Sequence, residues 1–340
     1  MFFKRLLGIL LASSALMASA QEVALNPQHP ERYVVVKGDT LWDISETFLR
    51  DPWLWPEVWY VNPQIENPHL IYPGDVITLV YIDGKPQLRV QRGHPTVKLS
   101  PRARATPLDR AIPTVPVDAI QQFLSKPLVL DEDALENAGY VLESADEHIV
   151  TGTGDRIYGR GMTTDYDRYN IFEPQYPYID PDTGELLGHR ALYVGEARVE
   201  RHGDPATLRL VETTREVSLG DRMLPVREEE VRSHFTPRAP ETDVEGRIIS
   251  VVDGVSQIGQ YQVVVINRGE REGLEAGHVL TIQQAGALVE DRFAEEREQV
   301  QLPNEDAGTL LVFRTFDKVS YGLVLEATRA IHIMDLVTSP

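Results

Sequence analysis

One short segment, residues 33–80, constrains the fold of this chain more than any other part of the sequence. Residues 33–36 and 76–80 are mostly β-branched or aromatic, which predicts a strand at each end of the segment. Gly38 permits a tight turn after the first strand, and Pro73-Gly74 makes another before the second. The two strands therefore enclose everything between them in one small unit.

Two helices are expected between these strands. Thr40 and Asp43 have the spacing of a capping box, and three apolar residues then fall on one helical face: Leu41, Ile44 and Phe48. A proline at position 56 suits the start of the second helix, and the Asn-Pro pair at 62–63 ends it. The order strand, helix, helix, strand predicts a small α+β (βααβ) unit with a core of few side chains.

All four tryptophans of the chain lie inside this unit. Small domains use large aromatic side chains to build a core, and Trp42 and Trp59 are expected there. Trp53 and Trp55 have two explanations, because they lie in the stretch that lengthens the connection between the helices. They belong either to the core or to an additional exposed surface that a partner covers.

The order of these residues resembles a LysM domain. The resemblance is carried by Tyr33, Gly38-Asp39-Thr40-Leu41, Ile44, Asn62-Pro63, Ile71 and Pro73-Gly74. In LysM domains, a glycan that contains N-acetylglucosamine lies in a shallow groove between the first strand-helix loop and the second helix-strand loop. The resemblance therefore implies that peptidoglycan is bound by Gly38, Asp39, Thr40, Leu41, Asn67, Pro68, His69, Leu70, Ile71 and Tyr72.

Several of these ten residues also have a purely structural explanation. Gly38 and Asp39 suit a turn and a helix cap, Leu41 and Ile71 suit a core, and His69 suits a surface loop. The sequence leaves both explanations open for each of them.

The first residues have the features of a secretory leader. Lys4 and Arg5 precede an apolar run over residues 6–17, and Ala18-Ser19-Ala20 provides a small-residue cleavage site. The run is shorter than the roughly 20 residues that a spanning helix needs. We therefore expect a signal peptide over residues 1–20, no transmembrane segment after cleavage, and a peptidoglycan-associated protein of the periplasm.

Composition excludes several classes of partner and site. Cysteine is absent, which removes disulfides, thiolate metal sites and cysteine nucleophiles. Lys+Arg number 33 against 52 Asp+Glu, and the net charge of −19 makes nucleic acid and anionic lipid poor partners. No cofactor is expected.

Residues 81–127 are rich in proline and arginine and are expected to form a linker that lets the first unit act at a distance from the rest. A short strand over 96–99 and a helix over 117–124 are expected within it. The basic residues suit a solvated linker better than a patch for an acidic partner.

The remainder divides into two mostly-β units, 128–240 and 241–340, after a short helix over 132–138. A weak repeat relates them, since residues 197–221 and 310–335 share a series of side chains with one single-residue offset. Both stretches end in the same order of residues: Glu212, Thr214-Arg215, Val217, Leu219 and Asp221 in one, and Glu326, Thr328-Arg329, Ile331, Ile333 and Asp335 in the other. The repeat predicts two related small β-barrel units.

The carboxyl-terminal unit also carries Asn267-Arg268-Gly269, Gly273-Leu274, Gly277 and Val279-Leu280. This spacing resembles the small barrel at the carboxyl end of the flagellar assembly protein T family. A leader, one LysM module, a long linker and such a barrel together resemble the secretin-associated proteins of the type IV pilus (TsaP). That resemblance implies an adaptor that binds peptidoglycan and the outer-membrane secretin of the pilus machine.

A LysM-anchored peptidoglycan hydrolase is the rival class of function. Zinc peptidases need clustered histidines, and the nine histidines here occur singly, without His-x-His or His-Glu-x-x-His. The nearest polar cluster, Glu143, Asp146, Glu147 and His148, is better explained as a solvated turn. The sequence therefore favours a non-catalytic adaptor with no metal site. An adaptor for another envelope machine, such as the flagellar basal body, stays as an alternative.

Overall fold

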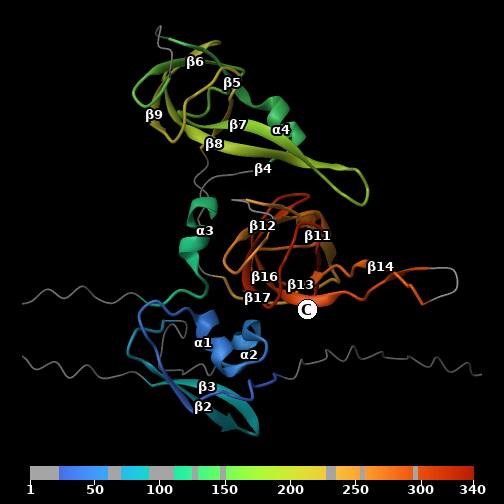
Figure 1. Ribbon diagram of the computed structural model, residues 1–340. Coiled ribbons are helices and arrows are strands. Elements are labelled where there is room, and N and C mark those ends of the chain that lie inside the picture. Colours follow the sequence, from blue (N-terminus) through green and yellow to red (C-terminus); the bar gives the residue numbers. More distant parts are fainter. Residues whose placement is uncertain are drawn as a thin grey trace, which may run out of the picture.

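The computed structural model describes residues 23–59, 70–91, 111–124, 129–145, 151–226, 235–252, 257–293 and 298–340. Figure 1 shows a small α+β unit in blue, a carboxyl-terminal barrel in orange and red beside it, and a middle β-rich unit beyond the barrel. The predicted class, an α+β module followed by mostly-β units, is confirmed. The expected leader and the expected strand at 96–99 lie outside the described residues.

The amino-terminal unit has a three-stranded antiparallel sheet in the order β1-β2-β3, with its helices between the first two strands. Its elements are β1 (Arg32–Val34), α1 (Leu41–Phe48), the 3-10 turn η1 (Pro52–Leu54), α2 (Trp55–Val58), β2 (Val76–Ile82) and β3 (Lys85–Gln91). The expected capping box is confirmed: Thr40 Oγ1 accepts the Asp43 amide, and the Asp43 carboxylate accepts the Thr40 amide. The cap fixes where α1 begins.

All four tryptophans are core residues. Trp42 and Trp59 are buried as expected, and Trp53 and Trp55 are only 8% and 1% exposed. The explanation that Trp53 and Trp55 form an additional exposed surface is therefore wrong, because Trp53 lies in η1 and both side chains are buried in the unit. Trp55 packs edge-on against Trp59, with ring centroids 6.1 Å apart. The indoles share this core with buried aliphatic side chains and one phenyl ring, among them Leu41, Ile44 and Phe48.

The unit extends beyond residues 33–80 on both sides. Strand β3 lies inside the stretch expected to be linker and pairs with β2 from Val76–Gln91 to Ile82–Lys85. The sequence did not predict this strand, because Pro86 cannot donate a hydrogen bond to a sheet. A proline is tolerated here because β3 is an edge strand. Before β1, the Asn26 amide donates to the Phe48 carbonyl at the end of α1.

Helix α3 (Val117–Leu124) confirms the helix expected from the sequence. It packs on the carboxyl-terminal barrel: Ile120 and Phe123 are buried, and the Phe123 ring lies 6.5 Å from that of Phe313. The Arg314 guanidinium donates to the Phe123 carbonyl at 2.9 Å. This part of the expected linker is therefore docked on a folded unit.

The middle unit is a sheet that closes on itself. It consists of β4 (Val129–Leu130), α4 (Glu132–Asn137), β5 (Gly139–Ser144), β6 (Arg156–Arg160), β7 (Arg168–Ile179), β8 (Leu186–Arg201), β9 (Ala206–Thr213) and β10 (Arg222–Pro225). Strand β9 pairs with β6 and also with β8, so β5-β6-β9-β8-β7-β10 form a ring, and β10 returns to β5. Strand β4 adds to β8 outside the ring.

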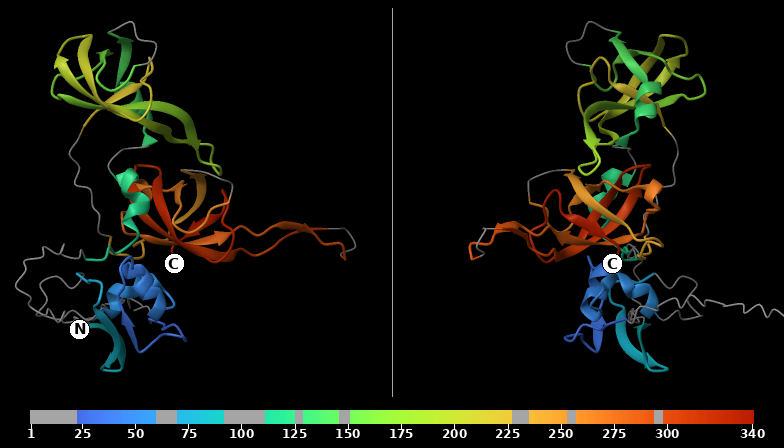
Figure 2. Two further views of the ribbon diagram at one scale, coloured as in Figure 1. Left: turned by 60° about the vertical axis from the view of Figure 1, so that its left-hand side comes forward. Right: turned by 90° about the vertical axis from the view of Figure 1, so that its right-hand side faces the viewer.

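The carboxyl-terminal unit is a closed barrel with the ring β11-β12-β17-β16-β13-β18. Its elements are β11 (Glu245–Val251), β12 (Val263–Ile266), η2 (Glu270–Glu272), β13 (Val279–Gln284), β14 (Leu288–Glu290), β15 (Gln299–Gln301), β16 (Glu305–Thr315), β17 (Ser320–Ala327) and β18 (Leu336–Thr338). Numbered along the chain, the ring strands of both barrels run 1-2-5-4-3-6. The β14–β15 hairpin projects from this barrel between its third and fourth ring strands (Figure 2).

The repeat seen in the sequence corresponds to equivalent contacts in the two barrels. The Thr214 amide donates to Val194 and the Thr328 amide to Ala307, each at 2.8 Å. Each repeat ends in a turn whose carboxylate accepts an amide three residues earlier, Asp221 from Ser218 and Asp335 from His332. Shared topology and shared contacts show that the two barrels are versions of one unit.

The barrels contact each other through the hairpin between β7 and β8, which reaches the carboxyl-terminal barrel (Figure 1). Asp180 is 4% exposed and accepts a hydrogen bond from the Asn267 amide group. Burial opposes its charge, but hydrogen bonds from its own loop and from Asn267, with the charge of Arg268, lower the pKa of Asp180. Glu185 at the same tip binds Arg271 and Lys318. Opposite charges therefore hold the hairpin in place.

Candidate glycan-binding groove

Two turns of the same design form the loops that the sequence assigns to glycan binding. In the first, the Asp39 carboxylate accepts the Val36 amide at 2.9 Å, and in the second, the Asp75 carboxylate accepts the Tyr72 amide at 3.0 Å. The residue before each aspartate is a glycine with positive φ, +104° at Gly38. A side chain is strained in that conformation, so glycine is needed there for the turn. Gly38 and Asp39 thus have the structural role that the sequence left open.

The two turns are held side by side by the backbone. The Val35 amide donates to the Asp75 carbonyl at 2.9 Å, and the Gly74 amide returns to the Val35 carbonyl at 2.8 Å. The Tyr33 hydroxyl donates to the Asp39 carboxylate at 3.0 Å, and burial, followed by the Asp39 carboxylate, raises the pKa of Tyr33. The loops therefore form a rigid pair rather than two independent segments.

One side of the groove is the amino terminus of α1. The first amides of a helix have no partner within it, and the side chain of Thr40 satisfies only that of Asp43. The amides of Leu41 and Trp42 donate to partners outside the helix. The Leu41 side chain is 1% exposed, so it is a core residue, and its backbone amide is the group that makes a contact outside the helix.

The other side of the groove is formed by Leu70, Ile71 and Tyr72. Leu70 is 37% exposed, whereas the Ile71 side chain is fully buried and its carbonyl accepts a hydrogen bond from outside the two loops. The remaining predicted residues, Asn67, Pro68 and His69, lie outside the described residues. Among those described, the structure brings the loops that carry Gly38–Leu41 and Leu70–Tyr72 side by side.

The chain's own residues 112–114 lie between these two sides. The Leu41 amide donates to the Pro113 carbonyl at 3.0 Å and the Trp42 amide to the Thr114 carbonyl at 3.1 Å. On the opposite side, the Ile112 amide donates to the Ile71 carbonyl at 2.8 Å. Sequence reasoning missed this segment, because its prolines indicate a linker and its partners are far away along the chain.

The groove has two donors, the Leu41 and Trp42 amides, on one side and an acceptor, the Ile71 carbonyl, on the other, and the apolar side chain of Leu70 is partly exposed beside them. An N-acetyl group has the same polar atoms as a peptide unit, one carbonyl oxygen and one N–H, next to a small methyl group. The arrangement that binds residues 112–114 is therefore also suited to the N-acetyl groups of a glycan.

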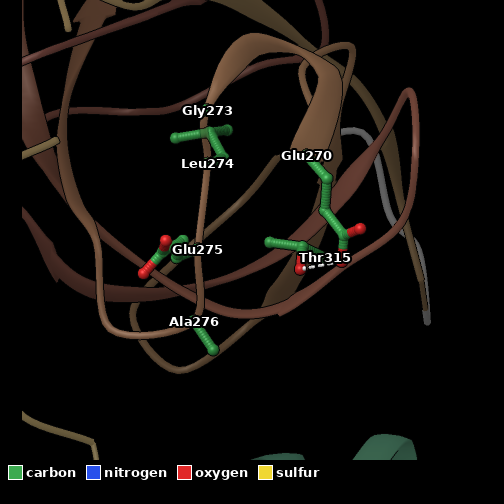
Figure 3. Close-up of a pocket in the computed structure, with 6 residues that line it drawn as sticks. All are labelled: Glu270, Gly273, Leu274, Glu275, Ala276 and Thr315. Carbon is green, nitrogen blue, oxygen red and sulfur yellow. Dashed lines mark hydrogen bonds between the residues drawn. The ribbon is translucent and has the colours of Figure 1, made fainter. Parts of the chain in front are cut away.

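A second depression lies on the carboxyl-terminal barrel, with a volume of about 500 Å³ (Figure 3). It is lined by Glu270, Gly273, Leu274, Glu275, Ala276 and Thr315. Both carboxylates already have partners: Glu270 accepts a hydrogen bond from the Thr315 hydroxyl, and Glu275 pairs with Arg238. The depression is a weaker candidate than the groove, because these two carboxylates belong to contacts within the chain and the sequence resemblance points to the groove.

Two further properties apply to the part of the chain that the structure describes. It contains no cluster of three or more His, Asp or Glu side chains that could hold a metal ion. It also contains no helix with the length and apolar character that crossing a membrane demands.

Comparison with known proteins supports the identity of the amino-terminal unit. Residues 33–80 match the LysM domain family. The chain is also 37% identical over 60 residues to the uncharacterized protein YqbP of Bacillus subtilis (strain 168). That match covers 15% of this chain and 27% of the length of YqbP. The chain therefore contains a LysM domain, a module that implies peptidoglycan binding and association with the cell envelope.

Proposed function

We propose that this protein is a non-catalytic adaptor of the periplasm that binds peptidoglycan through the groove of its LysM domain. The observation that carries the proposal is the groove itself, where Leu41 and Trp42 present amides opposite the Ile71 carbonyl within a matched LysM domain. A glycan rich in N-acetylglucosamine supplies the complementary amide groups along its length. The partly exposed side chain of Leu70 offers an apolar contact for its methyl groups.

The barrels are proposed to carry the partner rather than an active site. Their interiors are filled by apolar side chains, and both carboxylates of the depression on the carboxyl-terminal barrel are engaged. The order of modules, and its resemblance to the secretin-associated proteins of the type IV pilus, supports an outer-membrane secretin as that partner. The basal body of the flagellum is the alternative machine.

Co-sedimentation of the full chain with purified sacculi tests the proposal. We expect the protein to pellet with the sacculi, to be released by soluble chitohexaose, and to liberate no muropeptides during the incubation. Soluble muropeptides would identify a hydrolase, and a protein that stays in the supernatant would contradict binding through the LysM domain.

The partner is tested separately by capture from detergent-solubilised envelopes. We expect the full chain to retain the secretin. The charge reversal Glu185→Lys changes a residue of the contact between the two barrels and none of the LysM domain, so binding to sacculi should be unchanged. Recovery of flagellar components in place of the secretin would favour the alternative machine.

A further inference from the structure

Residues 112–115, called the strap here, occupy the LysM groove in this structure. We propose that the strap competes with glycan for the groove, so that the protein exists in a closed form, with the strap bound, and an open form that binds peptidoglycan. This inference rests on the proposed function, since it assigns a regulation to the same site.

The strap uses the polar groups on which glycan binding depends. Its carbonyls at Pro113 and Thr114 accept the amides of Leu41 and Trp42, and its Ile112 amide donates to Ile71. The Leu41 and Trp42 amides have one hydrogen each to donate, and the strap accepts both, so a second ligand cannot take the same position. Strap and glycan are therefore mutually exclusive.

The strap is also held by apolar contacts. Ile112 is 6% exposed and Val115 is fully buried, and both belong to the hydrophobic cluster that contains Leu41, Trp42 and Ile71. A segment that only passed over the groove would leave such side chains in water. The closed form is thus stabilised by burial as well as by three backbone hydrogen bonds.

The far side of the strap is attached to the rest of the molecule. The Thr114 hydroxyl accepts the Phe235 amide at 3.3 Å, and helix α3, which follows the strap directly, packs through Phe123 on the barrel. The Tyr261 hydroxyl of the barrel donates to Asp43 of α1 at 3.2 Å. The closed form therefore ties the groove to the barrel, and movement of one is coupled to opening of the other.

The apparent affinity for glycan is reduced by the fraction of molecules that is open. Weakening the strap without touching the groove must therefore tighten glycan binding. The double variant Ile112→Ala/Val115→Ala removes buried methyl groups from the strap and leaves the residues of the two loops intact. We expect it to bind chitohexaose at least tenfold more tightly than the wild-type full chain in calorimetric titration.

A matched control separates release of the strap from a general loss of stability of the protein. Ile157→Ala/Val217→Ala changes the same residue types at equally buried positions in the core of the middle barrel. We expect wild-type affinity for this variant. Equal affinity of the strap variant and the wild type would overturn the inference while leaving the proposed function standing. Failure of all three proteins to bind chitohexaose or sacculi would overturn both.

A measurement on the unaltered protein remains decisive even if the strap variant fails to fold. We expect saturating chitohexaose to increase amide hydrogen exchange in residues 111–116, because the Ile112 amide loses its acceptor. A ligand that binds while the exchange of this segment stays unchanged or slows would show that strap and glycan bind together, which the inference forbids.

Discussion

Thr40 offers a defined test of how the groove is built. In Thr40→Ala, the Asp43 amide loses its acceptor, and the carboxylate of Asp43 loses the hydroxyl that donates to it at 2.8 Å. Loss of such a cap costs about 1 kcal/mol, within a range of roughly 0.5–2. Thr40 is 4% exposed, so water replaces the lost bonds poorly, and the cost should lie in the upper half of that range. Thr40→Ser keeps both bonds and should cost only a few tenths of that amount.

Tryptophan fluorescence during urea unfolding measures this difference directly. All four tryptophans lie in the LysM domain and all are buried, so the signal reports this unit and not the barrels. The midpoint should fall for Thr40→Ala with no change in slope, and should stay close to wild type for Thr40→Ser. Equal destabilisation by both substitutions, or none by Thr40→Ala, would refute the role of the capping box.

Three further predictions concern the barrels and their contact with the LysM domain. In Gly308→Ala, the new methyl group would overlap the Glu326 carbonyl on the neighbouring strand, and calorimetry should show a loss of about 1–3 kcal/mol for the carboxyl-terminal barrel. Burial raises the pKa of Asp221 to about 6 from an ordinary 3.8, so the stability that its proton confers below pH 3.8 is lost as pH rises through about 6. Hydrogen exchange of the middle barrel should show this fall in stability with pH, and Asp221→Asn should abolish it. Burial, then the charges of Glu326 and Asp43, raise the pKa of Glu46. Because Glu326 belongs to the barrel that the closed form ties to the groove, the closed form should gain population as pH falls and lose it as pH rises through that pKa. Sacculi binding should therefore weaken at acid pH in the wild type and not in Glu46→Gln.

Local signals in the sequence predicted the LysM domain well. The turn at Gly38, the cap at Thr40 and the helix α3 each depend on residues that are neighbours along the chain. The relation between the barrels was also visible, because the repeat places the same side chains at the same strand-turn-strand positions around Asp221 and Asp335. Short-range physics and duplication both leave marks that can be read without a structure.

The parts that the sequence did not predict depend on distant contacts. Strand β3 exists because β2 provides a partner along its whole length, which Pro86 and the polar residues around it do not reveal. The strap is ordered because Leu41, Trp42 and Ile71 supply its hydrogen bonds. The burial of Trp53 and Trp55 likewise depends on how the short helices pack. Each case is a tertiary contact that overrides a local preference.

The most direct test of the central claim compares two leucine substitutions in sacculi co-sedimentation. Leu70→Glu places a charge at the exposed wall of the groove, and Leu288→Glu places the same charge on the distant β14–β15 hairpin, where the side chain is 59% exposed. If the groove binds glycan, Leu70→Glu should lower the affinity for sacculi at least tenfold, and Leu288→Glu should leave it at the wild-type value. Wild-type binding by Leu70→Glu, or equal losses in both variants, would contradict the assignment of the groove.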